Sequence, residues 1–218
     1  MIPVVIFGTG GFGREVHELL EDCIQAQANF DVVGFLDGNA RNHGSQVHGL
    51  PVLGGLEWLR DRSELKVVLG VGGPVTKRKI VEQIRVLGNS CITVIHPRAV
   101  IGRRVEIGEG SVVCAGTVIT TDTKIGAFST FNLNATIGHD SSIGPYCTFA
   151  PGANVSGSVT VGEGTDFGTN ASIIQGVSVG EWSIIGAGAS VVKDLGPNVT
   201  AVGVPARVIK EREPGWHL

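Results

Sequence analysis

An apolar residue returns at every sixth position from Ile101 to Val191 without a break. These anchors are Ile101, Ile107, Val113, Ile119, Ile125, Phe131, Ile137, Ile143, Phe149, Val155, Val161, Phe167, Ile173, Val179, Ile185 and Val191. A period of six predicts short strands joined by corners, with three repeats in each coil of 18 residues. One coil alone buries almost nothing, so the coils must stack into a parallel β-solenoid whose interior holds the anchors.

Residues 1 to about 95 show a different pattern, in which apolar strands alternate with amphipathic helices. We expect strands over 2–7, 31–36, 66–71 and 91–95, and helices over 14–27 and 76–87. This alternation predicts a small parallel sheet of Rossmann-like α/β type. His96-Pro97 ends the pattern. We therefore predict an α/β domain over 1–96 and a solenoid domain with a C-terminal tail over 97–218.

A glycine-rich turn connects the first strand to the first helix. Its sequence, Gly8-Thr9-Gly10-Gly11-Phe12-Gly13, fits the fingerprint that lets backbone N–H groups approach a pyrophosphate. Asp37, Gly72 and Gly73 follow two further strands at the same edge of the predicted sheet. The sequence thus predicts a nucleotide site built from Gly8, Gly10, Gly11, Phe12, Gly13, Asp37, Gly72 and Gly73. One alternative is a turn that only connects the strand to the helix. The other is an NAD site, which is disfavoured because about 95 residues supply only half of a doubly wound domain.

Composition limits the partners of the chain. A net charge of −3 gives no reason to expect nucleic acid or an anionic membrane surface as a partner. Apolar runs stay well short of 18 residues, so we expect no membrane span and a cytoplasmic location. The four cysteines are far apart and form no C-x-x-C pair, so we expect buried reduced thiols.

The repeat resembles that of the hexapeptide acyltransferases, which implies a left-handed parallel β-helix. The whole chain resembles the family of sialic acid O-acetyltransferases and sugar-nucleotide N-acetyltransferases. The matching stretches are Gly8–Gly13, Phe35-Leu36-Asp37, Ile95-His96-Pro97, Asn132–Asp140 and Gly203-Val204-Pro205-Ala206. The resemblance implies acetyl-CoA as co-substrate, no metal, and a homotrimer with active sites between subunits. The implied reaction is N-acetylation of an amino sugar carried on UDP, GDP or dTDP, for bacterial glycan biosynthesis. The alternative is O-acetylation of a sialic acid-like sugar.

His139 is the one histidine within the repeat, and it follows Gly138 at an outward corner. Imidazole is the side chain that titrates closest to neutral pH, so it can take a proton from an amine that attacks a thioester. The adjacent Asp140 would hold the tautomer and stabilise the imidazolium. The resemblance implies the same two roles. The alternative is a solvated surface histidine.

Two further residues complete the predicted catalytic set. Gly157 lies 18 residues beyond His139, so it should stack on the same corner and offer its N–H to an oxyanion. The alternative is a corner glycine like the others. Asn132 takes the place of the usual glycine after its anchor, and the resemblance implies that it contacts the sugar.

The resemblance places acetyl-CoA in the groove between neighbouring prisms. Gly186, Ala187 and Gly188 offer small side chains beside which a pantetheine arm could lie. The CoA phosphates could meet the cations Lys193, Arg207 and Lys210. The alternative is a solvated basic tail.

Two positions depart from the family. Phe12 and Thr148 stand where many relatives carry histidine.

A γ-class carbonic anhydrase needs three imidazoles on zinc, whereas this repeat holds one. An ice-binding or scaffold solenoid would not need a nucleotide-binding domain. Residues 39–54, with His43 and His48, are expected to form a mobile surface loop. The alternative is that this segment contributes to the choice of base and sugar.

Overall fold

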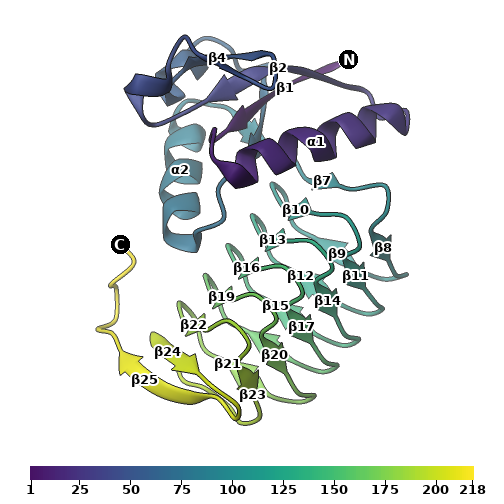
Figure 1. Ribbon diagram of the computed structural model, residues 1–218, viewed down its shortest axis with the longest axis vertical. Helices are drawn as coiled ribbons and strands as arrows, with labels where there is room; N and C mark the ends of the chain where they lie inside the picture. Colours follow the sequence, from purple (N-terminus) through teal and green to yellow (C-terminus); the bar gives the residue numbers. More distant parts are fainter.

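The computed structural model describes all 218 residues, and it places an α/β unit on the side and end of a β-helical column (Figure 1). The α/β unit holds a six-stranded sheet in the order β3-β4-β2-β1-β5-β6. Its elements are β1 (Ile2–Phe7), α1 (Gly11–Gln25), β2 (Phe30–Leu36), η1 (Ala40–Asn42), β3 (Gln46–Val47), β4 (Leu50–Gly54), η2 (Leu56–Leu59), β5 (Lys66–Leu69), α2 (Pro74–Val86) and β6 (Ser90–Cys91). All neighbours pair in parallel except β3 and β4. The predicted Rossmann-like sheet is confirmed.

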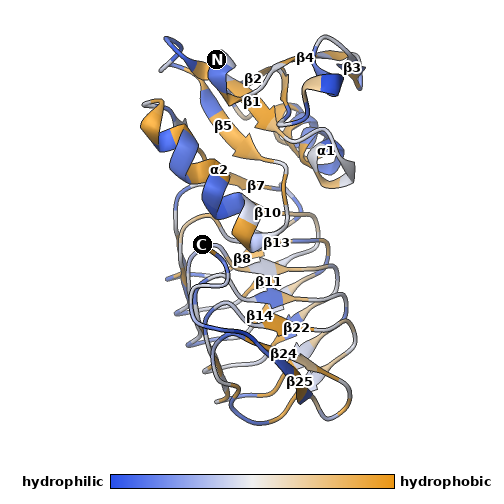
Figure 2. Cartoon of the chain, turned by 90° about the vertical axis from the view of Figure 1, so that its left-hand side faces the viewer, coloured by the Kyte–Doolittle hydropathy of each residue, from blue (hydrophilic) through white to orange (hydrophobic).

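Both helices follow from apolar residues at helical spacing. Helix α1 buries Val16, Leu19, Leu20 and Cys23 on one face. Helix α2 begins with Pro74, whose fixed φ suits the first helical position. Strands β1 and β5 are hydrophobic (Figure 2) and lie between the two helices, because α1 packs on one face of them and α2 on the other. Helix α1 begins at Gly11, three residues earlier than predicted, because the second half of the glycine-rich stretch already has helical conformation.

The column consists of two-residue strands stacked at intervals of 18 residues. They are β7 (Val94–Ile95), β8 (Val100–Ile101), β9 (Glu106–Ile107), β10 (Val112–Val113), β11 (Val118–Ile119), β12 (Lys124–Ile125), β13 (Thr130–Phe131), β14 (Thr136–Ile137), β15 (Ser142–Ile143), β16 (Thr148–Phe149), β17 (Asn154–Val155), β18 (Thr160–Val161), β19 (Asp166–Phe167), β20 (Ser172–Ile173), β21 (Ser178–Val179), β22 (Ile184–Ile185) and β23 (Ser190–Val191). Strands β24 (Val199–Val202) and β25 (Arg207–Glu211) continue one sheet at the far end. The predicted parallel β-helix and its 18-residue register are confirmed.

Three sheets form the three faces of the column. The first face contains β7, β10, β13, β16, β19 and β22, the second face contains β8, β11, β14, β17, β20 and β23, and the third face contains β9, β12, β15, β18 and β21. The anchors fill the interior, where Phe131, Phe149 and Phe167 stack with ring centroids 5.0 Å apart. We call the corner between the first and second faces corner one, and the corner between the second and third faces corner two.

The α/β unit packs against the first face. Its apolar clusters include Val94, Val112, Phe128 and Tyr146, which belong to the column. The prediction of a single strand over 91–95 is wrong. Strand β6 ends the sheet at Cys91, and Val94–Ile95 form β7, which pairs with β10 of the column. The domain boundary at residue 97 stays a prediction.

Residues 39–54 do not form the expected surface loop. Strand β4 lies beside β2 in parallel, and β3 pairs back on β4 as a short hairpin. His48 and Gly49, with φ of +49° and +79°, form the turn between them. The segment therefore extends the sheet and lies beside the carboxyl end of β2. Neither helix of the chain has the length and apolar composition needed to cross a bilayer.

Candidate active site

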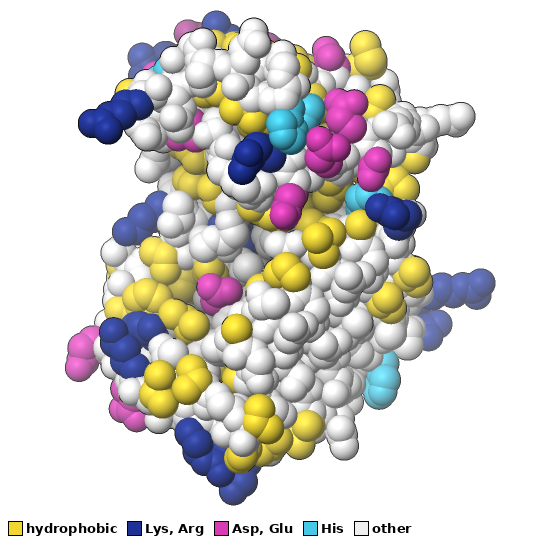
Figure 3. Space-filling model, viewed as in Figure 1, with side chains coloured by type: hydrophobic (Ala, Val, Ile, Leu, Met, Phe, Trp, Pro, Cys, Tyr) yellow, Lys and Arg dark blue, Asp and Glu magenta, His cyan; other side chains and the backbone are white.

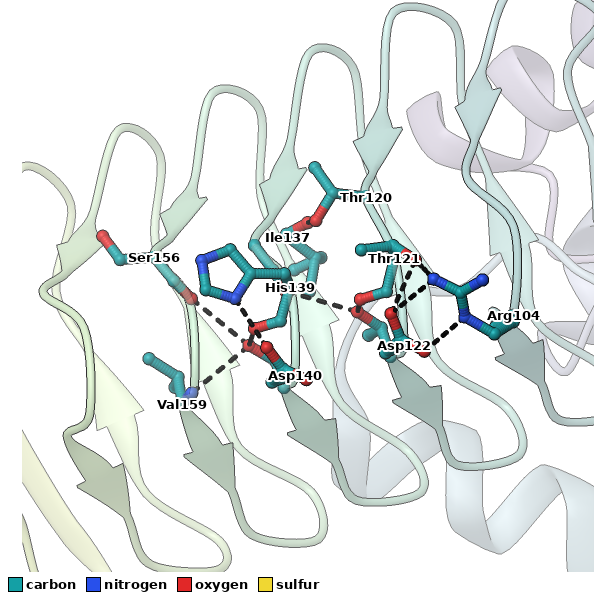
Figure 4. A network of polar contacts seen from close by, with 12 residues as sticks. Arg104, Thr120, Thr121, Asp122, Ile137, His139, Asp140, Ser156 and Val159 are labelled. Carbon is teal, nitrogen blue, oxygen red and sulfur yellow. Dashed lines mark hydrogen bonds and ion pairs between the residues drawn. The ribbon is translucent and has the colours of Figure 1, made fainter.

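His139 projects from corner two, just after β14, and its imidazole contacts the next side chain (Figure 4). His139 Nδ1 lies 2.8 Å from Asp140 Oδ2. Asp140 has a φ of +57°, so the backbone turns sharply between the second and third faces. The side chain of His139 is 62% exposed, and its Nε2 makes no hydrogen bond within the chain. The predicted histidine–carboxylate contact thus exists in the fold.

Gly157 lies beneath the ring of His139, one coil further along. A Cβ at this position would come within 2.5 Å of His139 Nε2 and 2.6 Å of Cε1. The Gly157 N–H donates to no acceptor within the chain. A side chain at position 157 would therefore displace the imidazole from its place in this fold. Its predicted role as an oxyanion donor is untested.

The other candidates in the column lie along both edges of the second face. Lys193 lies at corner two, three coils beyond His139 in the register of the repeat. Asn132 and the segment Gly186–Gly188 lie at corner one. Asn132 Oδ1 accepts a hydrogen bond of 2.7 Å from Leu133 N, which leaves its amide nitrogen free to donate. The width of the second face separates Asn132 from His139, so a single chain does not bring these two residues together.

The remaining CoA candidates lie on exposed surface near the end of the column. Ala187, Gly188, Lys193, Arg207 and Lys210 are all exposed. Gly188 has open space where a side chain would lie. Gly186 is different, because a Cβ there would come within 2.7 Å of Val202. Its glycine is explained by packing.

The glycine turn divides into packed and open positions. A Cβ on Gly13 would come within 1.9 Å of Gly8 O, so this glycine allows α1 to approach β1. Gly10 and Gly11 have nothing within 4 Å of that position, so their backbone is open to a ligand. Phe12, where the resemblance implies a histidine in many relatives, packs against the apolar cluster beneath α1.

Asp37 is held at the end of β2 by the turn itself. Its Oδ2 accepts hydrogen bonds from the N–H and hydroxyl of Thr9, and its Oδ1 accepts one from Asn39 N at 2.8 Å. Burial alone would raise the pKa of Asp37, but the hydrogen bonds from Thr9, Asn39 and Asn42 lower it overall. The carboxylate therefore stays ionised at neutral pH.

A cavity of about 660 Å³ opens beside Asp37. Its lining residues are Phe7, Gly8, Asp37, Gly38, Ala40, His43, Gly55, Leu56, Glu57, Val71, Thr76, Ile80 and Gln83. Of the predicted nucleotide residues, Gly8 and Asp37 line this cavity, whereas Gly73 lines a smaller one of about 160 Å³ between the α/β unit and the column. The surface is hollowed where these two parts meet (Figure 3). His43, from the segment 39–54, also lines this cavity, whereas sequence analysis missed Glu57 and Gln83, which lie outside the recognisable motif.

Thr148, the second position at which the resemblance implies a histidine, connects the column to the α/β unit. Its hydroxyl donates to Gly72 O at 2.5 Å and accepts from Lys77 Nζ at 3.0 Å. The Lys77 ammonium also donates to Thr130 Oγ1 at 3.0 Å and to Cys147 O at 3.1 Å. Thr148 thus holds the predicted nucleotide residue Gly72 against the first face.

Lys77 itself was missed in the sequence analysis. It is fully buried on the apolar face of α2, and burial lowers its pKa to about 7 although Cys147 and Asp166 act to raise it. The helical period of Ile80, Val81 and Ile84 places position 77 on that same face, which is the signal that could have revealed it.

All four cysteines are buried and unpaired, as expected. Burial raises the pKa of Cys91, Cys114 and Cys147 to about 12. The thiols therefore stay protonated at neutral pH, which argues against a covalent acyl-cysteine intermediate.

Comparison with known proteins defines the class. Residues 3–84 match the family described as the PglD N-terminal domain, and residues 98–121 and 158–193 match the hexapeptide repeat of succinyl-transferase. PerB from Caulobacter crescentus, in complex with CoA and GDP-perosamine, superposes with a TM-score of 0.87 at 35% identity over 95% of this chain and 97% of that one. The acetyltransferase domain of PglB from Neisseria gonorrhoeae, in complex with acetyl coenzyme A, gives a TM-score of 0.86 at 30% identity, with coverage of 95% and 99%.

A sequence relative agrees with these structures. GDP-perosamine N-acetyltransferase of Escherichia coli O157:H7 is 33% identical over 59% of this chain and 58% of its own length. The matched segment thus spans little more than half of this curated relative. The left-handed β-helix with its α/β unit defines the chain as a hexapeptide-repeat acyltransferase. Within that class, the chain belongs to the family of nucleotide-sugar N-acetyltransferases, as the resemblance implied.

Proposed function

We propose that this protein transfers the acetyl group of acetyl-CoA to the amino group of a nucleotide-linked deoxysugar, with His139 as general base. The observation that carries the proposal is the open Nε2 of His139, whose Nδ1 contacts Asp140 while its ring lies over Gly157. Relatives crystallised with CoA and GDP-perosamine, or with acetyl coenzyme A, support the two substrates. A cytoplasmic location stays the prediction from the sequence.

The two ring nitrogens of His139 have different roles, because Nδ1 holds the ring in place and Nε2 takes and returns the proton. Asp140 accepts the hydrogen bond of Nδ1–H, which leaves the lone pair of Nε2 free. As the sugar amine forms its bond to the acetyl carbon, Nε2 takes the amine proton. The tetrahedral intermediate then expels the CoA thiolate by breaking the C–S bond, and the imidazolium returns the proton to sulfur. The Gly157 N–H is the proposed donor to the intermediate's oxyanion.

The α/β unit supplies the nucleotide site in this proposal. The open backbone at Gly10 and Gly11 suits the pyrophosphate at the start of α1. The cavity beside Asp37 takes the nucleoside, with the ionised carboxylate as acceptor for ribose or base N–H groups. Because Thr148 and Lys77 hold α2 against the column, the nucleotide site and His139 keep a constant separation.

We further propose a homotrimer in which the second face of one chain meets a neighbouring column. Asn132 and His139 lie on opposite edges of that face, so a second chain is needed to bring such edges together. Exposed apolar side chains lie on the second face and at both of its corners, at Val100, Leu133 and Ile174. Lys193 and Gly186–Gly188 lie on the same two edges and would line the groove that receives CoA.

A thiol-release assay tests the reaction. Acetyl-CoA is offered with UDP-, GDP- and dTDP-linked 3-amino and 4-amino sugars, and with free sialic acid. Turnover on an amino sugar nucleotide supports the proposal. Turnover on sialic acid alone would replace it with O-acetylation, and no turnover on any acceptor would contradict the acceptor class. Light scattering tests the assembly, for which a mass three times the 22.7 kDa chain is expected.

A further inference from the structure

Two histidines of the α/β unit lie in contact with each other, and neither takes part in the proposed reaction. His17 lies on the second turn of α1, and His48 lies in the turn between β3 and β4. Glu18 joins them from α1. We propose that His17, Glu18 and His48 bind a divalent transition-metal ion, zinc in particular, which ties the β3–β4 turn to α1.

The donor atoms already have the spacing of a metal site. His17 Nδ1 lies 3.2 Å from His48 Nδ1, and His48 Nδ1 lies 3.4 Å from Glu18 Oε1. One donor atom from each residue lies within 4.8 Å of the other two. Two nitrogens bound tetrahedrally to zinc are about 3.4 Å apart, given Zn–N distances near 2.1 Å. Two imidazoles and one carboxylate are also a common zinc ligand set, with water as the fourth ligand.

His17 is oriented as a metal ligand would be. It is only 6% exposed, and its Nε2 has no hydrogen-bond partner. That nitrogen lies 3.5 Å from Glu21 Oε1, one turn further along α1. A metal-bound imidazole usually faces a carboxylate or carbonyl with its second nitrogen, which fixes the ring.

Hydrogen bonds within the cluster explain its geometry less well than a bound cation does. A single proton on one Nδ1 can form the hydrogen bond between His17 and His48 or the one between His48 and Glu18, but it cannot form both well. A cation accepts lone pairs from all three residues at once. Histidine and acidic side chains gather over α1 on the face seen in Figure 3.

The cluster is connected to the cavity beside Asp37. The segment that ends at His48 begins with η1, and Ala40 and His43 from this segment line the cavity. Asn42 Nδ2 donates to Thr9 Oγ1 at 3.2 Å, within the glycine turn. A metal at His17 and His48 would therefore hold one wall of this cavity against α1. Its role is structural, because His139 lies in the column.

Zinc binding to the full-length protein tests the proposal. The purified chain is treated with EDTA, desalted and titrated with ZnCl2 by calorimetry, and Co²⁺ absorption serves as a second probe. His48→Asn removes one ligand, and asparagine tolerates the φ of +49°. Glu18→Gln removes the carboxylate from an exposed position. His139→Ala is the matched control, since it removes an exposed imidazole beside a carboxylate elsewhere.

We expect one zinc per chain in the wild type and in His139→Ala, with a higher Tm when zinc is bound. His48→Asn should bind at least a hundredfold more weakly and show no zinc-dependent Tm shift, and Glu18→Gln should be weakened at least tenfold. Equal zinc affinity in the wild type and His48→Asn would overturn the proposal. Loss of the site in His139→Ala alone would overturn it too, by assigning the metal to the column.

Discussion

The imidazole of His139 lies directly over the α-carbon of Gly157, one coil of the β-helix further on. The repeat brings these two residues together, because residues 18 apart stack on the same corner. Only glycine at position 157 leaves room for the His139 imidazole in this place. The first prediction follows from that contact.

Gly157→Ala should lower kcat about a hundredfold, because the new Cβ would move the His139 ring by an ångström or so. Binding of the sugar nucleotide should change little, since it takes place in the α/β unit. Gly196→Ala is the control, because a Cβ added at Gly196 would lie in open space. Steady-state kinetics of both variants make the comparison. Full activity in Gly157→Ala would rule out this placement of the base.

Asp37→Asn should weaken binding of the nucleotide sugar at least tenfold and leave acetyl-CoA binding unchanged. The substitution removes an ionised acceptor that organises Thr9 and Asn39 beside the cavity, and such hydrogen bonds contribute about 1.5–3 kcal/mol. Calorimetric titration with each substrate measures the two affinities separately. Asp31→Asn, at an exposed position of β2, is the matched control. Equal weakening for both substrates would place Asp37 outside the nucleotide site.

Thr148→Val should lower the free energy of unfolding by about 1–3 kcal/mol, because it leaves Gly72 O without its donor and Lys77 with one acceptor fewer. Thr160→Val is the control, because Thr160 also precedes an anchor but lies exposed on the third face. Urea unfolding compares the two variants. If both lose the same small amount, the hydroxyl of Thr148 has no special part in joining the α/β unit to the column.

The lowered pKa of Lys77 predicts how the free energy of unfolding changes with pH. Its pKa is about 7 in the folded chain, whereas a free lysine titrates near 10.4. Between these values the unfolded chain binds more protons, so the Lys77 contribution to stability rises with pH. The free energy of unfolding of the wild type should therefore increase from pH 7 to pH 9 relative to Lys77→Met. Urea unfolding at three pH values measures the difference, and parallel curves would show that Lys77 keeps its proton.

The hexapeptide period predicted the column, its register and the His139–Asp140 corner, because a strictly repeating backbone leaves few alternatives. The contacts of the α/β unit were less accessible. Lys77 finds its three acceptors only after α2 docks on the first face, which no local pattern encodes. Strand β4 was missed because Pro51 and short flanking segments weaken its pattern, and its pairing with β2 spans a turn made by His48 and Gly49. The trimer prediction concerns surfaces between chains, so the fold of one chain supports it only indirectly. The support is the exposed Val100, Leu133 and Ile174, together with the placement of Asn132 and His139 on opposite edges of the second face.

The central claim is that His139 is the base, and His139→Ala tests it most directly. Thiol release with the amino sugar nucleotide found in the substrate panel should fall about 10²- to 10⁴-fold, the range of general base catalysis. The affinity for that nucleotide sugar, measured by calorimetry on the same preparation, should stay within twofold of the wild type. Turnover equal to that of the wild type, with substrate still bound, would contradict the account and move the base to another residue.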